Sequence, residues 1–277
     1  MELNLINTGY FKLDGGAMFG VVPKSLWSRT NPADENNLCS WAMRSLIIKE
    51  GDRAIIVDNG MGDKQSEKFF GFYYLHGDDS LSKGLRKADV GFDEITEAFL
   101  THLHFDHCGG GVRREGDKLV PTFSNATYWS NKDHWKWATE PNSRERASFL
   151  TENILPMRES GQLEFASIPK ESRLPFEIIF VDGHTDKQML PKIKYKGKTL
   201  VFVADLLPSV GHIPLPYVMG YDTRPLLTME EKHKFLNEAA DNGYVLVFQH
   251  DPVNECCTVK HTEKGVRVDQ VFPFHEI

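Results

Sequence analysis

Short apolar runs alternate with amphipathic stretches along this chain. The apolar runs predict strands, because each is short and is bounded by turn-forming residues; they cover residues 43–48, 54–57, 95–100, 127–129, 176–181, 200–204 and 244–249. The amphipathic stretches predict helices at the start of 63–74 and over 81–88, 132–138, 143–155 and 228–243. Some predicted strands follow one another directly, and others are separated by helices. This pattern favours an α/β fold with mixed sheets over a strict βαβ repeat.

Two local signals mark the ends of the last predicted helix. Thr228 and Glu231 have the spacing of a capping box, which predicts that the helix begins at Thr228. Gly243 is a typical helix-ending residue and predicts the C-terminus of the helix.

The composition is that of an ordinary globular chain. Of its 277 residues 40% are apolar and 26% are charged, so we expect a single domain over residues 1–277. The net charge of −7 argues against nucleic-acid binding through bulk charge. No apolar run reaches the ~18 residues that a membrane span needs. Residues 1–10 lack the pattern of a secretory signal and two of the four cysteines are adjacent, which predicts a cytoplasmic protein without a disulfide framework.

A cluster of metal-ligating side chains follows the predicted strand 95–100. The cluster consists of His102, His104, Asp106 and His107, and glycines 109–111 come directly after it. Imidazole and carboxylate groups are the ligands that zinc and related divalent ions prefer. Chance would produce this pattern roughly one time in a thousand. The alternative is a histidine-rich surface turn without metal, which would leave the clustered imidazoles without a role.

Three more residues of ligand type stand at the ends of later strands. His184 follows the strand 176–181, Asp205 follows 200–204, and His250 follows 244–249. A single histidine at a strand end is more often structural than metal-binding. Ligands at the ends of several strands of one sheet can converge on one edge, so the three positions and the His102 segment together predict a metal site.

The order of these residues resembles the metallo-β-lactamase superfamily of metallohydrolases, whose H-x-H-x-D-H motif matches residues 102–107. The resemblance covers residues 46–250 and implies a four-layer αβ/βα sandwich with mixed sheets. It also implies two divalent metal ions, with zinc expected first and manganese, iron or cobalt as alternatives. By this resemblance the ligands of the two ions would be His102, His104 and His184 for one, and Asp106, His107 and His250 for the other, with Asp205 bridging both.

The resemblance also implies a reaction. A hydroxide that bridges the two ions would be a nucleophile at neutral pH, because divalent cations lower the pKa of bound water. One ion would polarise the carbonyl or phosphoryl oxygen of the substrate, and Asp106 would carry a proton to the leaving group. We therefore expect a dinuclear metal-dependent hydrolase that cleaves a small ester-like substrate.

Other motifs indicate the branch of the superfamily. True β-lactamases lack the carboxylate at Asp205, and the oxygen-reducing di-iron branch has a glutamate in place of His104. Residues 15–24 and 204–222 are similar to the quorum-quenching lactonases and the organophosphate-hydrolase-like group. This likeness favours a lactone, such as an acyl-homoserine lactone, or a carboxylic ester. Acyl-homoserine lactonases usually have a tyrosine where this chain has Pro208, and His212 or Tyr221 would have to replace it.

Four side chains are candidates for contact with the substrate. Phe105 lies between two predicted ligands, Phe19 is on a segment that can cover the site, and His212 and Tyr221 follow Asp205 closely. The aromatic run 69–74 can line a pocket for an acyl chain, belong to the core or form a homodimer contact. As partner we expect a small-molecule ester or lactone, and neither nucleic acid nor a membrane.

Three other functions stay open at this point. A phosphotriesterase-like enzyme would use the same ligands. A thioester hydrolase like glyoxalase II shares all seven ligand types but would need a basic patch for the carboxylates of glutathione. A metal-dependent RNA-processing protein is disfavoured by the net charge, and a non-catalytic binding protein by the intact set of ligands.

Overall fold

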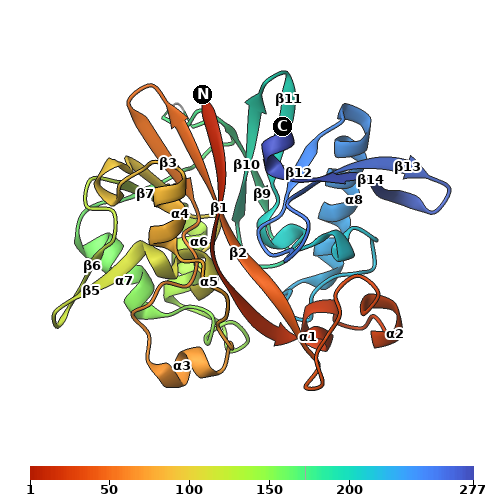
Figure 1. The fold of residues 1–277 in the computed structure, drawn as a ribbon, viewed down its shortest axis with the longest axis horizontal. Helices are drawn as coiled ribbons and strands as arrows, with labels where there is room; N and C mark the ends of the chain where they lie inside the picture. Colours follow the sequence, from red (N-terminus) through yellow and green to blue (C-terminus); the bar gives the residue numbers. More distant parts are fainter. Residues whose placement is uncertain (172) are drawn as a thin grey trace. The chain divides into compact units, whose positions relative to one another are not determined.

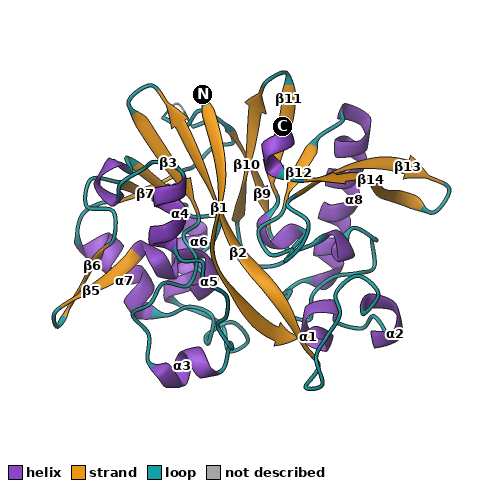
Figure 2. Cartoon of the chain, viewed as in Figure 1, coloured by secondary structure: helices purple, strands orange, loops and turns teal. Residues whose placement is uncertain are grey.

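The structure is a computed structural model that describes residues 1–171 and 173–277. The chain forms two compact units (Figure 1): unit 1 comprises residues 1–10 and 43–169, and unit 2 comprises residues 11–42 and 170–277. Both units combine strands with helices (Figure 2). Within the described residues, no helix has the length and apolar character to cross a bilayer. A single domain over residues 1–277 stays a prediction.

Unit 1 is built on a six-stranded mixed sheet with the order β1-β2-β3-β4-β7-β8. β2 and β3 pair antiparallel, whereas β4 and β7 join β3 and β8 in parallel. The strands are β1 (Glu2–Asp14), β2 (Leu38–Glu50), β3 (Arg53–Val57), β4 (Glu97–Phe99), β7 (Thr127–Ser130) and β8 (Leu163–Phe165), and β5 (Val112–Glu115) and β6 (Lys118–Pro121) form a separate hairpin. Residues 11–14 of β1 and 38–42 of β2 belong to unit 2.

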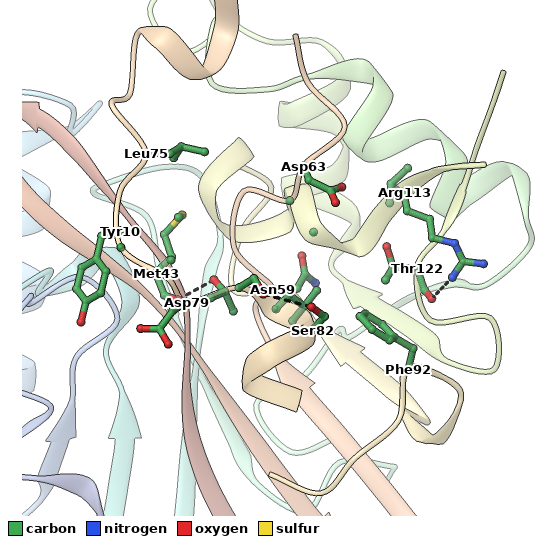
Figure 3. A pocket seen from close by; sticks show the side chains of 18 of the residues that line it. Tyr10, Met43, Asn59, Asp63, Leu75, Asp79, Ser82, Phe92, Arg113 and Thr122 are labelled. Atoms are coloured by element: carbon green, nitrogen blue, oxygen red, sulfur yellow. Dashed lines mark hydrogen bonds between the residues drawn. The ribbon is translucent and has the colours of Figure 1, made fainter. Parts of the chain in front are cut away.

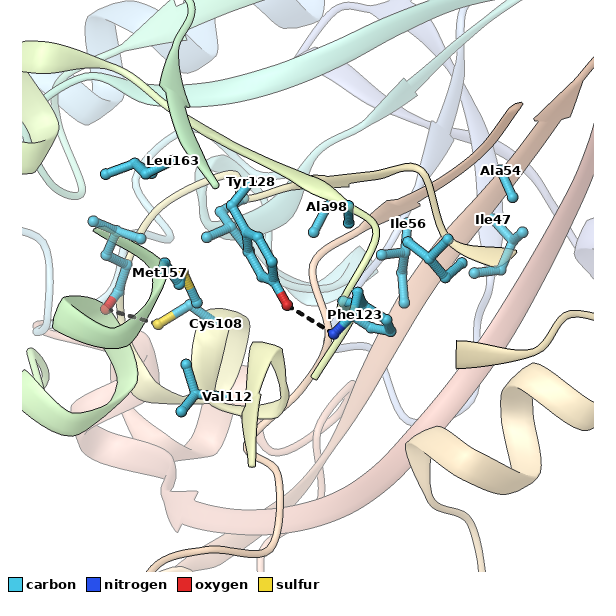
Figure 4. Packing of buried hydrophobic residues seen from close by; sticks show 14 of the residues in the cluster. Ile47, Ala54, Ile56, Ala98, Cys108, Val112, Phe123, Tyr128, Met157 and Leu163 are labelled. Carbon is cyan, nitrogen blue, oxygen red and sulfur yellow. Dashed lines mark hydrogen bonds between the residues drawn. The ribbon is translucent and has the colours of Figure 1, made fainter. Parts of the chain in front are cut away.

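Helices cover one face of this sheet and complete the core of unit 1. Leu85 of α4, Ala138 of α6 and Met157 of α7 belong to one buried cluster with Ile56 of β3 and Tyr128 of β7. Figure 4 shows Met157, Ile56 and Tyr128 in this cluster. Burial of these apolar side chains fixes the sheet and with it the loop that follows β4. The helices are α3 (Glu67–Gly71), α4 (Leu81–Lys87), α5 (Phe105–Cys108), α6 (Lys132–Thr139) and α7 (Thr151–Glu159), with short 3₁₀ turns η1 (Phe92–Glu94) and η2 (Gly109–Gly111).

Unit 2 has its own six-stranded mixed sheet, with the order β14-β13-β12-β11-β10-β9. β11 and β12 pair in parallel, and the other neighbours pair antiparallel. The strands are β9 (Glu177–Val181), β10 (Gln188–Tyr195), β11 (Lys198–Phe202), β12 (Val245–Val247), β13 (Cys256–Thr262) and β14 (Gly265–Phe272). The helices are α1 (Gly15–Phe19), α2 (Lys24–Trp27) and α8 (Pro225–Asn242), with 3₁₀ turns η3 (Ala204–Leu206), η4 (Val210–His212) and η5 (Phe274–Glu276).

Helix α8 begins three residues earlier than predicted. Pro225 is its first residue, and Thr228 lies inside the helix with its hydroxyl donating to the Arg224 carbonyl. The Glu231 carboxylate accepts from the backbone N–H groups at 182 and 183, so the predicted capping box is wrong. Gly243 ends the helix in a left-handed conformation, with φ 61°, as predicted.

The predicted helix over residues 143–155 is wrong in its first half. The helix there is α7, which begins at Thr151. Asn142 accepts from the backbone N–H groups of Arg144 and Glu145 through its side-chain oxygen, which favours a turn over a helix. The Glu145 side chain then turns into the protein interior, where it has a structural role described below.

Candidate metal centre

The loop after β4 brings the four predicted ligands of unit 1 close together. His102 comes three residues after the end of β4, and α5 begins after His104 and contains Asp106 and His107. All four side chains are buried. His102 Nε2 lies 3.0 Å from His104 Nδ1, and His107 Nε2 lies 3.6 Å from an Asp106 oxygen. These four groups therefore converge within one short loop.

Asp58, at the end of β3, holds this loop in place. Its carboxylate accepts hydrogen bonds from the backbone N–H and the hydroxyl of Thr101, each 2.7 Å long, and from His107 Nδ1 at 2.9 Å. Because the Thr101 hydroxyl donates to Asp58, its oxygen accepts a hydrogen bond from His102 Nδ1 at 3.1 Å. The Nε2 atoms of His102 and His107 are thereby left with lone pairs, the form in which imidazole binds a metal.

Glu145 has the same function for His104. Its buried carboxylate accepts from His104 Nε2 at 3.2 Å, from Trp137 Nε1 at 2.6 Å and from the Asn142 amide at 2.7 Å. The bond to His104 leaves the lone pair on Nδ1. His134 of α6 accepts the backbone N–H of Leu103 at 2.8 Å and so fixes the chain between two predicted ligands.

The spacing of the nitrogen atoms fits a metal. Two nitrogens bound to one tetrahedral zinc at about 2.0–2.1 Å lie about 3.3 Å apart. His102 Nε2 and His104 Nδ1 are 3.0 Å apart, and the remote nitrogen of each ring has its own hydrogen-bond partner. The residues of this loop therefore fit a divalent ion both in spacing and in the tautomers that their partners impose.

Asp205 is the centre of the ligand group in unit 2. One of its oxygens lies 3.1 Å from His184 Nε2, and the other lies 3.0 Å from His250 Nε2. Each residue stands just after a strand: His184 after β9, Asp205 in η3 after β11, and His250 after β12. All three side chains are buried. The carboxylate of Asp205 thus faces two imidazoles with separate atoms.

The outer nitrogens of these two histidines are also fixed. His184 Nδ1 donates to an Asp222 oxygen at 3.0 Å, and His250 Nδ1 donates to the Ala42 carbonyl at 2.8 Å. Burial would lower the pKa of His184, but attraction to Asp205 and hydrogen bonds to Asp205 and Asp222 raise that pKa to about 10. Both rings direct Nε2 toward the Asp205 carboxylate.

Sequence reasoning missed the outer partners Asp58, Glu145 and Asp222, as well as His134. Asp58 had a signal in the sequence, because it directly follows the predicted strand 54–57 as the other candidates follow theirs. Glu145 and Asp222 had none, since each reaches its histidine from a turn.

Two of the predicted substrate-contacting residues lie in the interior of unit 2. The Phe19 ring stacks on His212 with a centroid distance of 4.3 Å. His212 lies 2.8 Å from the Ser209 hydroxyl through Nδ1 and donates to the Met18 carbonyl at 2.9 Å through Nε2. Tyr221 is different, because 41% of it is exposed. Contact of these residues with a substrate stays a prediction.

The aromatic run of unit 1 divides into two parts. The rings of Phe69 and Tyr73 lie 5.4 and 4.6 Å from the ring of Phe105, which stands between two predicted ligands. Phe72 and Tyr74 are mostly exposed, at 65% and 54%. An apolar wall therefore lies beside the loop of predicted ligands, whereas Phe72 and Tyr74 face solvent.

Comparison with known sequences now identifies the family. The chain matches the family model of the metallo-beta-lactamase superfamily over residues 44–250. The chain belongs to the metallo-β-lactamase superfamily. The predicted family is confirmed, and the chain is a metal-dependent hydrolase in the broad sense of this superfamily. No curated protein is significantly similar to the chain in sequence.

Solved structures confirm the metallo-β-lactamase fold. A probable metal-dependent hydrolase from Staphylococcus aureus is 27% identical, with 98% of this chain and 96% of that chain covered and a TM-score of 0.88. AidC, a dizinc quorum-quenching lactonase, is 21% identical, with 98% and 95% covered and a TM-score of 0.80. The hydrolase AbOPH is 19% identical, with 98% and 94% covered and a TM-score of 0.78.

Glu145→Ala should destabilise this metallo-β-lactamase superfamily protein by about 3 kcal/mol. The substitution leaves the buried N–H of His104 and the partly buried N–H of Trp137 without their acceptor, and buried groups of this kind cost about 1–3 kcal/mol each. Chemical denaturation measures the free energy of unfolding. Glu140→Ala, at an exposed position nearby, is the control and should change it by less than about 0.5 kcal/mol. Equal effects of both substitutions would contradict the role of Glu145.

His212 predicts a pH dependence of stability. Burial lowers the pKa of its imidazole from 6.5 to about 3, opposed by the hydrogen bond to Met18. Between these values the unfolded chain binds a proton that the folded chain does not bind, so stability is lost as the pH falls from 6.5 toward 3. His212→Phe keeps an aromatic ring and should weaken this dependence. NMR should find the His212 ring neutral at pH 5, and a protonated ring at that pH would contradict the prediction.

Proposed function

We propose that this protein is a dinuclear, zinc-dependent hydrolase of lactones or carboxylic esters. In this proposal seven side chains hold a pair of ions, as the family resemblance implies. The ligands would be His102, His104 and His184 for one ion and Asp106, His107 and His250 for the other, with Asp205 shared.

The geometry of Asp205 carries this proposal. Its two oxygens approach different imidazoles, His184 at 3.1 Å and His250 at 3.0 Å, and those imidazoles are assigned to different ions. A carboxylate can bridge two ions by offering one oxygen to each, and the two contacts of Asp205 support this arrangement. A bridging carboxylate at this position is also the feature that separates the chain from the true β-lactamases.

Different side chains of the protein would have different roles in ester cleavage. When bound, two divalent cations lower the pKa of water toward neutrality and polarise an ester carbonyl. The Asp106 carboxylate, nine-tenths buried beside His107, would take up a proton and deliver it to the leaving alkoxide oxygen. Asp58 and Glu145 would keep the neighbouring imidazoles in the tautomers that bind metal.

The surroundings of the ligand loop support a substrate with an apolar part. Phe69, Tyr73 and Phe105 form an aromatic wall next to His104 and Asp106, and this wall suits an acyl chain. AidC is a lactonase whose structure contains the product N-hexanoyl-L-homoserine, and at 21% identity it lends support to the lactone reading.

Tyr221 is the better candidate to replace the tyrosine that is missing at Pro208. His212 is 1% exposed and bonds inside unit 2 through both ring nitrogens. Tyr221 carries a phenol and is 41% exposed, so solvent and a substrate can reach it more easily. A phenol can donate a hydrogen bond to a substrate carbonyl, which proline cannot do.

Asp205→Ala should lower the metal content of the zinc-loaded protein from two ions toward one. The substitution removes the only ligand assigned to both ions, and elemental analysis of the dialysed protein measures the ratio. Asp241→Ala removes an exposed carboxylate that pairs with His261 and is the control, with two ions expected. Two tightly held ions in the Asp205→Ala variant would contradict the bridging role.

The substrate class is tested with a panel of lactones, aryl esters, phosphotriesters and thioesters on the zinc-loaded protein. We expect the highest kcat/KM for a lactone or an aryl ester. Tyr221→Phe should lower kcat/KM about tenfold with unchanged metal content, because one hydrogen bond to the substrate is lost. Activity on none of the four classes, or a clear preference for phosphotriesters or thioesters, would overturn the proposed substrate.

A further inference from the structure

Unit 1 contains a cavity that the proposed reaction does not use. It has a volume of about 390 Å³ and lies among β1, the loop after β3, the start of α4 and the β5–β6 hairpin. Among the described residues that line it, the four ligand side chains of the loop after β4 are absent. Its size falls within the range of cavities that hold small molecules.

Asn59 contributes an unsatisfied amide to this cavity. The residue has no exposed surface, and neither its side-chain oxygen nor its side-chain nitrogen has a hydrogen-bond partner within the described part of the chain. Its backbone N–H donates to the His107 carbonyl at 2.8 Å, which fixes the residue firmly. In Figure 3 the Asn59 amide lies between Asp79 on one side and Thr122 on the other.

Thr122 contributes a second unsatisfied group. The residue is 5% exposed, and its hydroxyl also lacks a partner among residues 1–171 and 173–277. Its backbone N–H donates to the Gly111 carbonyl at 2.9 Å, and a Cβ at Gly111 would lie 3.2 Å from the Asn59 nitrogen. Gly111 thus leaves room beside the Asn59 amide.

Such groups are uncommon because they are costly. A buried polar group without a partner costs about 1–3 kcal/mol, and folded proteins keep few of them. Two that line the same cavity point to a partner that enters from outside the chain.

The charged groups of the cavity wall are either bonded within the protein or exposed to solvent. Asp79 accepts from Asn7 and forms an ion pair with Lys87. Arg113 donates to the Thr122 carbonyl at 3.0 Å. Asp63 also lines the cavity but is exposed to solvent. The deepest polar groups are therefore neutral, and each side chain offers both donors and acceptors.

Apolar surface completes the cavity. Met43, Leu81 and Phe92 line it together with the polar groups, and the ring of Phe92 stacks against Phe123 at 6.1 Å. A ring that is fixed in this way can receive the C–H face of a small cyclic molecule. An amide, a hydroxyl and an aromatic ring together favour a neutral ligand with hydroxyl groups over an ion, because a hydroxyl both donates and accepts.

We propose that this cavity binds a small uncharged molecule that carries several hydroxyl groups, of the monosaccharide or cyclic polyol class. The Asn59 amide and the Thr122 hydroxyl bind its hydroxyl groups, and Phe92 covers its apolar face. This site belongs to unit 1 alone and does not depend on the metal pair or on the proposed hydrolase activity.

The test is a titration of the full-length protein with D-glucose, D-galactose and myo-inositol, followed by NMR. D-glucuronate and cyclohexanol are the matched probes, the first with a charge and the second with a single hydroxyl. At least one neutral polyol should bind with a Kd of about 1 mM or tighter and shift the Asn59 side-chain amide signals. Glucuronate and cyclohexanol should bind at least tenfold more weakly.

Asn59→Leu and Thr122→Val replace each polar group by an apolar group of similar shape and should each weaken binding about tenfold. Asn36→Leu and Thr139→Val change exposed residues of the same types and should leave it unchanged. Asn59 directly follows Asp58, so Asn59→Leu can disturb the fold at that carboxylate. Thr122→Val changes a residue that is not next to Asp58, and it still tests the proposal if Asn59→Leu fails to fold.

Three results would overturn the proposal. The first is the absence of binding by all three neutral polyols, as expected if the cavity holds only water. The second is equal binding of glucuronate. The third is binding that survives both Asn59→Leu and Thr122→Val, which would place the ligand elsewhere.

Discussion

A buried imidazole that donates a hydrogen bond through one nitrogen must present a lone pair at the other, unless a second proton is bound. This constraint recurs in both units. His102, His104 and His107 each have an outer partner in unit 1, and His184 and His250 each have one in unit 2. The partners set the direction of every ring, so the predicted ligands are already ordered by the fold.

Asp58 connects two segments of unit 1 through its hydrogen bonds. This carboxylate accepts three hydrogen bonds and thereby joins the end of β3 to the loop after β4. Glycine is needed where the two segments meet, because a Cβ on Gly109 would collide with the Met61 carbonyl and a Cβ on Gly110 with the Asn59 carbonyl. The apolar cluster beneath, with Ile56 and Tyr128, keeps these strands in register.

The sequence is informative where the chemistry is local. The H-x-H-x-D-H segment can be recognised directly, because its four ligand-type residues lie within six positions. His184, Asp205 and His250 can be recognised because each follows an apolar strand. The strands β3, β7, β9, β11 and β12 are likewise found, since they are short apolar runs between turns. The family match over residues 44–250 agrees with this interpretation.

Features that depend on distant partners could not be predicted in this way. Glu145 lies 41 residues from His104, and its turn arises from the Asn142 side chain. Thr228 and Glu231 have the spacing of a capping box, but contacts with residues 182 and 183 engage Glu231 instead. β1 alternates between buried and partly exposed residues without a clean apolar run, so it escapes a search for such runs.

X-ray absorption spectroscopy of the zinc-loaded protein tests the central claim most directly, because it reports the neighbours of each metal ion. If the two ligand groups hold a pair of ions, the spectrum should contain only nitrogen and oxygen ligands and a second metal at about 3.5–4 Å. A zinc without a metal neighbour, or one with sulfur at about 2.3 Å, would contradict the account.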